Sequence, residues 1–175
     1  MKVLFDCYGK IFSTVKWNGC FSHYSCIRSG IRQGGIVSPV LFNIYIDSLI
    51  CALKCSDYGC HMGDVYSGCI ANADDIFLLS ASLSGLQKML DICYSCSSDL
   101  DIIFNPKKSC LFCIGKDYNA VLPNLRLCNT NVFWCNKLKY LGLTFVSSKK
   151  LVVDITPVLR KFYAAANAMD QLINR

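Results

Sequence analysis

The acidic pair Asp74-Asp75 constrains the fold of this chain more than any other feature. Two β-favouring runs precede it, Val65-Tyr66 and Cys69-Ile70, and a third, Ile76–Leu79, follows it. Because Asn and Asp favour turns, the segment Asn72–Asp75 predicts a hairpin with both acids at its tip. Carboxylates close to a core are costly unless a cation compensates them. The pair therefore indicates a site for a hard cation such as Mg²⁺, with an ordinary solvated turn as the alternative.

The composition indicates a folded protein with a polyanionic partner. Hydrophobic residues make up 53% of the 175 residues, and the net charge is +6. The cysteine count of 13 is odd, and the N-terminal residues lack the apolar stretch of a signal peptide. We therefore expect reduced thiols in a cytoplasmic or nuclear protein that is not secreted. We expect no membrane span, since Asn43, Asp47 and Ser48 interrupt the most apolar window.

Three amphipathic helices are predicted. The first starts at Ser38-Pro39, a capping hydroxyl followed by Pro at the first helical position, and continues for about four turns to Leu53. The second follows a capping box at Ser84–Gln87 and has helical periodicity to Leu100. The third begins at Thr156-Pro157.

The strand predictions rest on turn signals and β-favouring runs. Asn18-Gly19 predicts a tight hairpin between Val15–Trp17 and Phe21–Ile27. Further strands are predicted at 111–114 and 140–145, and a loop is predicted over residues 116–131.

Four segments, in order along the chain, are similar to the conserved motifs of reverse transcriptases. Ser29–Asp47, which includes Arg32-Gln33-Gly34-Gly35, resembles motif B, and Ala73–Ile76 resembles the catalytic motif C. Phe104–Ser109 resembles motif D, and Leu138–Leu143 resembles motif E, the primer grip. Arg160–Tyr163 resembles the start of the thumb, so the similarity covers nearly the whole chain.

The resemblance is to reverse transcriptases of the non-LTR, LINE-type retrotransposons. It implies an α+β fold: a partial polymerase palm over residues 1–146, with an antiparallel sheet and helices packed on one face, and the first thumb helix in 147–175. It also implies an RNA-directed DNA polymerase that uses an RNA template, a DNA primer, a dNTP and Mg²⁺ or Mn²⁺.

The same resemblance implies roles for individual residues. Asp74 and Asp75 would be catalytic and would ligate the metal. The remaining implied roles are nucleotide or template binding for Arg32, Gln33, Gly34 and Lys108, with Lys107 as the alternative to Lys108, and the primer grip for Tyr140, Leu141 and Gly142.

Two departures from the family pattern affect the expected activity. Asn72 stands where the family usually has Tyr. The family's other catalytic aspartate, in motif A, is expected upstream of Val15, in a segment that together with the fingers is missing from this chain. We therefore expect the chain not to polymerise DNA by itself.

Several alternatives remain at this point. The chain could be a degenerate or host-encoded remnant that binds nucleic acid weakly without catalysis. A viral RNA polymerase is disfavoured by Arg32–Gly35 and by the style of motifs D and E. Cys93-x-x-Cys96 with Cys110-x-x-Cys113 imitates a zinc site, although small buried hydrophobes are preferred. Trp17 and Trp134 could stack on bases, but packing is preferred for both.

Overall fold

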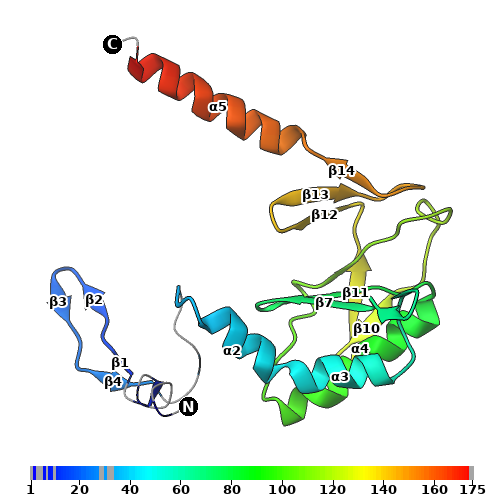
Figure 1. Cartoon of the computed structure of the whole chain (residues 1–175), viewed down its shortest axis with the longest axis horizontal. Helices are drawn as coiled ribbons and strands as arrows, with labels where there is room; N and C mark the ends of the chain where they lie inside the picture. The colour runs from blue at the N-terminus through cyan, green and yellow to red at the C-terminus, as the bar shows by residue number, and fades with distance from the viewer. Residues whose placement is uncertain are drawn as a thin grey trace. The chain divides into compact units, whose positions relative to one another are not determined.

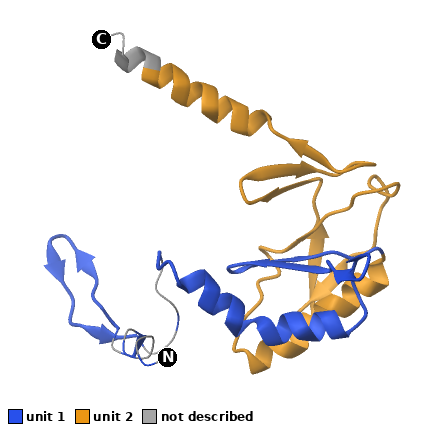
Figure 2. Cartoon of the chain, viewed as in Figure 1, with its two compact units in different colours: residues 1–81 blue, residues 82–175 orange. Residues whose placement is uncertain are grey.

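The computed structural model describes residues 2, 6, 8, 9, 11–27, 30 and 34–173 (Figure 1). The chain divides into two compact units, residues 1–81 and 82–175 (Figure 2). The first unit holds helices α2 and α3 and strands β1–β8; the second holds α4, α5 and β9–β14. This mixture of helices and small sheets confirms an α+β protein.

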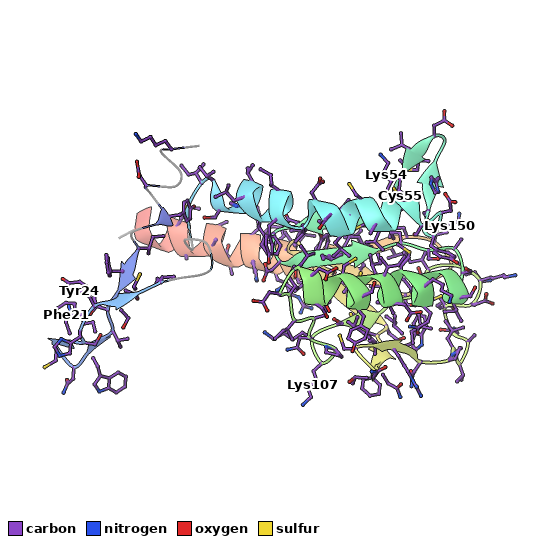
Figure 3. The ribbon with its side chains drawn as sticks, turned by 90° about the horizontal axis from the view of Figure 1, so that it is seen from below. Phe21, Tyr24, Lys54, Cys55, Lys107 and Lys150 are labelled. Atoms are coloured by element: carbon purple, nitrogen blue, oxygen red, sulfur yellow. The ribbon has the colours of Figure 1, made fainter. Side chains whose placement is uncertain are left out.

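A hairpin opens the first unit. β1 (Phe12–Ser13) pairs with β4 (Ser25–Cys26), and β2 (Lys16–Trp17) pairs with β3 (Cys20–Phe21). Asn18 and Gly19 form its turn with φ values of 47° and 84°, a left-handed pair that suits the twist of a two-residue hairpin. The predicted Asn-Gly hairpin is confirmed, and Figure 3 shows Phe21 and Tyr24 on it.

The prediction of one continuous helix after Ser38-Pro39 is wrong. Two helices, α2 (Ser38–Tyr45) and α3 (Asp47–Cys55), meet at an angle of 44°. The backbone leaves the helical region at Ile46, where ψ is 2°, and the Ile46 side chain is fully buried. Helical periodicity continues through this position, so it could not reveal the break in the backbone.

The predicted capping role of Ser38 is also wrong. Val37 is the N-cap residue of α2, without a capping side-chain hydrogen bond, and Ser38 is the buried first residue of the helix. Within the described ranges, no single helix is long and apolar enough to cross a membrane; α2 and α3 reach that length and composition only when the bent pair is counted together.

Two hairpins complete the first unit. β5 (His61–Met62) pairs with β6 (Val65–Tyr66), and β7 (Cys69–Asn72) pairs with β8 (Asp75–Leu78). A Cβ added to Gly68, between the two hairpins, would lie 2.6 Å from the Tyr66 ring, so a larger residue there would force that ring to move. The second hairpin confirms the predicted placement of the acidic pair at a tip.

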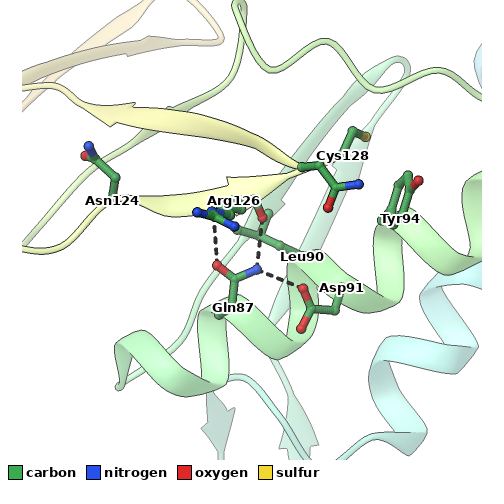
Figure 4. A pocket seen from close by; sticks show the side chains of 8 residues that line it. Gln87, Leu90, Asp91, Tyr94, Asn124, Arg126 and Cys128 are labelled. Atoms are coloured by element: carbon green, nitrogen blue, oxygen red, sulfur yellow. Dashed lines mark hydrogen bonds between the residues drawn. The ribbon is translucent and has the colours of Figure 1, made fainter.

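Helix α4 (Leu83–Asp99) anchors the second unit. Its N-cap is Ser82, whose Oγ accepts a hydrogen bond of 3.1 Å from the Gly85 N–H. The predicted capping box at Ser84 is therefore wrong by two residues. Gln87, assigned to that box, instead hydrogen-bonds the backbone of Arg126 beside a pocket of about 370 Å³ (Figure 4).

A three-stranded sheet packs against α4 in the order β10-β11-β9. The strands are β9 (Cys110–Leu111), β10 (Leu125–Leu127) and β11 (Thr130–Trp134), and β11 runs parallel to β9. The core consists of buried aliphatic side chains and the α4 leucines against them: Leu111, Leu125, Leu127, Val132, Leu83, Leu86 and Leu90. The loop predicted over residues 116–131 is thus wrong, because β10 lies within it and supplies two core leucines.

A second three-stranded sheet leads into the closing helix. It contains β12 (Lys137–Tyr140), β13 (Leu143–Val146) and β14 (Val152–Asp154), followed by α5 (Thr156–Ile173). The prediction of one strand over 140–145 is wrong, because the chain turns at Leu141 and Gly142. The helix predicted at Thr156-Pro157 is confirmed, and Asp154 Oδ1 accepts a 3.0 Å hydrogen bond from the Thr156 N–H.

Candidate active site

The acidic pair lies at the tip of the β7–β8 hairpin. Asn72 pairs with Asp75 across the strands, which leaves Ala73 and Asp74 as the two turn residues. Both carboxylate side chains are exposed. Because directly paired residues of an antiparallel ladder project to the same face, Asn72 and Asp75 are neighbours on one face of the hairpin.

The turn that carries Asp74 is strained. Ala73 has φ 51°, a left-handed conformation that costs a residue other than glycine about 1–2 kcal/mol. A glycine at this position would avoid that cost. Such strained backbone concentrates at functional sites, where the surrounding structure holds it in place.

A packed layer supports this hairpin. Helices α2 and α3 both contact β7. Ile46, Leu49 and Leu53 on these helices are buried, and burial raises the pKa of the Cys69 thiol at the start of β7. The acidic tip is therefore the exposed end of a supported element.

The donor set at the tip is compatible with a hard cation. In the part of the chain that the structure describes, neither the Asp74 nor the Asp75 carboxylate has a hydrogen bond or an ion pair with a protein group. No group of three or more His, Cys, Asp or Glu side chains within the described ranges is placed to share a metal ion. Mg²⁺ usually takes one or two carboxylates together with substrate phosphates and water, and two carboxylates meet that requirement.

The cysteines of the zinc alternative lie on a helix and near a strand. Cys93 is buried within α4, and Cys96 lies one turn further along the same helix, while Cys110 belongs to β9. No cysteine in the described part of the chain forms a disulfide. The buried position of Cys93 fits the role of a small hydrophobic side chain.

The motif B residues are only partly described. Arg32 and Gln33 lie outside the described residues. Gly34 is exposed with φ 77°, and a Cβ built on it would meet no atom within 4 Å. Open space beside a glycine is what a closely approaching ligand needs.

Lys108, predicted to bind the nucleotide or the template, lies in the second unit together with its alternative, Lys107. The turn that carries it is held by Asn105: the Lys108 N–H donates to the Asn105 carbonyl at 3.1 Å, and the Lys107 N–H donates to Asn105 Oδ1 at 3.0 Å. Both lysine side chains are exposed, and Lys107 extends into solvent in Figure 3. The turn thus presents two cationic side chains next to each other.

The predicted primer grip forms the tip of the β12–β13 hairpin in the second unit. Tyr140 pairs with Leu143, and the turn residues Leu141 and Gly142 have φ values of 48° and 82°. Leu141 is 65% exposed. Leu141 therefore places an apolar side chain in solvent, at a turn position whose left-handed φ favours glycine.

The two tryptophans differ. Trp134 packs against the core of the second unit, and its Nε1 donates to the Pro123 carbonyl at 3.1 Å, which confirms the packing prediction. Trp17 is 81% exposed, so the preference for packing was wrong there. The sequence analysis did not predict that the aromatic residues of the N-terminal hairpin are exposed together. One signal was available, because the segment that contains them has no acid between Asp6 and Asp47.

Known proteins match this chain over most of its length. The profile of the reverse transcriptase (RNA-dependent DNA polymerase) family matches residues 2–145. The chain is 27% identical over 155 residues to the Pol polyprotein of the type-2 retrotransposable element R2DM of Drosophila melanogaster, and 30% identical over 150 residues to that of a type-1 element R2 of Popillia japonica. These alignments cover 78% and 79% of this chain but only 14% and 25% of the relatives.

A further relative is the probable RNA-directed DNA polymerase from transposon BS of Drosophila melanogaster, 25% identical over 169 residues. That alignment covers 92% of this chain and 18% of the relative. The matched proteins are retrotransposon polymerases, and their family profile spans the acidic hairpin, both lysines and the β12–β13 turn. The chain therefore belongs to the reverse transcriptase family.

Proposed function

We propose that this chain provides the catalytic hairpin of an RNA-directed DNA polymerase, in which Asp74 and Asp75 hold divalent cations against the phosphates of a dNTP. The proposal is carried by the exposed carboxylate pair at the tip of a hairpin supported by α2 and α3. When bound, Mg²⁺ or Mn²⁺ supplies a Lewis acid that activates the attacking hydroxyl and stabilises the leaving oxygen.

The other residues would bind and orient the substrates. Arg32, Gln33 and Gly34 would border the incoming nucleotide and the template, and the open space at Gly34 supports this role. Lys108 would offset charge on the departing pyrophosphate. The primer backbone would be held by the β12–β13 tip, namely Tyr140, Leu141 and Gly142.

The proposed arrangement is that of a polymerase palm. Residues 1–146 would belong to the palm and 147–175, with α5, to the start of the thumb. The partners would be an RNA template and a DNA primer, in the cytoplasm or nucleus. The family resemblance assigns no motif A aspartate to these 175 residues, so we expect the chain by itself not to extend a primer.

Asn72 favours a second candidate, a non-catalytic remnant. It replaces the aromatic residue usual in the family, and it lies directly across from Asp75 on the hairpin. A remnant would bind a primer-template in a salt-sensitive manner without incorporating nucleotides.

Cation binding tests the acidic pair directly. Mn²⁺ added to the 175-residue chain should broaden the NMR signals of residues 73–76, and Asp74→Asn/Asp75→Asn should abolish the effect. Asp64→Asn is the matched control, since Asp64 is a single exposed acid in the β5–β6 turn of the same unit. Equal broadening in the double variant and the wild type would refute the proposed metal role.

Primer extension separates enzyme from remnant. The chain alone should show no extension on an RNA template above an Asp74→Ala control, and extension above that control would contradict our expectation. Joining an N-terminal segment that supplies a motif A aspartate should give activity that depends on Asp74. If that fusion binds primer-template but stays inactive, and Asn72→Tyr does not restore activity, the remnant is the correct assignment.

A further inference from the structure

The N-terminal hairpin exposes aromatic side chains that pack against no core. We call residues 12–26 the aromatic hairpin; exposed fractions are 60% for Phe12, 81% for Trp17, 67% for Phe21 and 80% for Tyr24. Burying one such side chain is typically favourable, and folded proteins rarely leave several exposed together unless they contact another molecule. The aromatic hairpin is therefore an interaction surface.

Three of these rings lie on the two paired arms of the hairpin. Phe12 pairs with Cys26, and Lys16 pairs with Phe21, so Lys16 and Phe21 lie side by side on one face. Tyr24 lies between the strand segments Cys20–Phe21 and Ser25–Cys26. Figure 3 shows Phe21 and Tyr24 projecting from the hairpin.

A cation accompanies the rings. Lys16 Nζ lies 5.3 Å from the centroid of the Phe21 ring, within cation–π distance. The aromatic hairpin therefore combines exposed aromatic rings with a positive charge.

The hairpin is ordered by its own hydrogen bonds. Thr14 Oγ1 donates to the Ser22 carbonyl at 3.1 Å, and the Val15 N–H donates to Ser22 Oγ at 2.9 Å. The Ser22 N–H donates in turn to the Val15 carbonyl at 2.9 Å. The rings are thus held on a framework formed before any partner arrives, which reduces the entropy lost on binding.

The surrounding sequence selects the class of partner. Residues 7–46 contain no Asp or Glu, while Lys10, Lys16, Arg28 and Arg32 give this segment +4 of the chain's net +6. An apolar protein partner would require no such exclusion of acids. A polyanion would, because each acid close to its phosphates would be repelled.

We propose that the aromatic hairpin binds single-stranded RNA, with Phe12, Phe21 and Tyr24 stacking on unpaired bases and Lys16 pairing with a phosphate. Unpaired bases expose their faces, whereas a duplex covers them, and aromatic stacking is the usual mode of single-strand recognition. Phe12, Phe21 and Tyr24 occupy separate positions along the hairpin, so each ring can take a separate base. The choice of RNA over DNA rests on the proposed function, in which the template is RNA.

Fluorescence anisotropy with a labelled 12-nucleotide RNA of mixed sequence tests the proposal. Phe21→Ala/Tyr24→Ala should weaken binding about tenfold or more. Lys16→Ala should make the slope of log affinity against log salt concentration shallower by about 1, as expected for the loss of one phosphate contact. Phe133→Ala is the matched control, since Phe133 is an equally exposed (69%) strand residue of the second unit, and it should bind as the wild type.

The assay runs in EDTA without dNTP, so its result is separate from that of the catalytic proposal. Circular dichroism of the variants checks that these exposed substitutions leave the fold intact. Equal affinity of the hairpin double variant and the Phe133 control would overturn the proposal. Tighter binding of single-stranded DNA or of an RNA–DNA duplex would also overturn it.

Discussion

Gln87 joins α4 to the edge of β10, and its removal should loosen the second unit. Its side-chain amide donates to the Arg126 carbonyl at 2.9 Å, and its Oε1 accepts from the Arg126 N–H at 2.8 Å (Figure 4). The amide thus takes the place of a neighbouring strand at Arg126. A further bond of 2.8 Å reaches Asp91 Oδ1, one helical turn along α4.

The expected effect follows from these bonds. Each of the two backbone bonds contributes about 1 kcal/mol net, and partial access of water lowers the sum, so Gln87→Ala should destabilise the second unit by about 1–2 kcal/mol. Gln87→Glu keeps the acceptor for the Arg126 N–H but loses the donors and places a negative charge beside Asp91. We expect it to be at least as destabilising, with Asp91→Asn recovering part of the loss.

Hydrogen exchange at the Arg126 amide is the direct measurement, supported by urea unfolding. A loss of 1–2 kcal/mol corresponds to about 5- to 30-fold lower protection. Lys88→Ala, an exposed substitution on the next residue of α4, should change stability by less than about 0.5 kcal/mol. If Gln87→Ala leaves Arg126 as protected as the Lys88 variant does, the bridge contributes nothing and the reasoning fails.

Two further predictions concern titrating groups. Burial, with a smaller effect of neighbouring Cys110, raises the pKa of the Cys135 thiol from 9.0 to about 12. At pH 8 iodoacetamide should therefore label Cys135 roughly a thousandfold more slowly than an ordinary thiol. A labelling rate that levels off near pH 9, measured by peptide mapping, would contradict this. Hydrogen bonds from Thr156 lower the pKa of the Asp154 carboxyl below its ordinary value of 3.8. These bonds should therefore stabilise the start of α5 fully above pH 3.8, and the stabilisation should be lost as the pH falls through the lowered pKa of the folded chain. Asp154→Ala should remove this acid dependence from the Thr156 amide signal, and an unchanged titration would exclude the role of Asp154.

Much of the architecture could be predicted from local sequence patterns. The Asn18-Gly19 turn, the acidic tip at Asp74-Asp75 and the helices α4 and α5 all follow from turn chemistry and periodicity, which operate within a few residues. The family assignment could also be predicted, since its motifs are contiguous segments. These features survive because neighbouring parts of the chain agree with them.

Errors arose where a local signal was ambiguous. Leu141 is a poor turn residue by propensity, so the hairpin tip at Leu141-Gly142 was predicted as continuous strand. Ser84 and Ser82 are both capping residues, and only the bond from the Gly85 N–H to Ser82 decides between them. The site residues in motif B, Arg32 and Gln33, stay predictions.

The sequence by itself determined which segments turn, which form helices and which carry the acids, because those outcomes depend on contacts along the chain. Tertiary structure alone decided that the helix bends at buried Ile46, that Gln87 bonds a strand 39 residues away, and that Trp17 stays in solvent. Each of these depends on a partner, or on the lack of one, far along the chain. Local propensity contains no information about such partners.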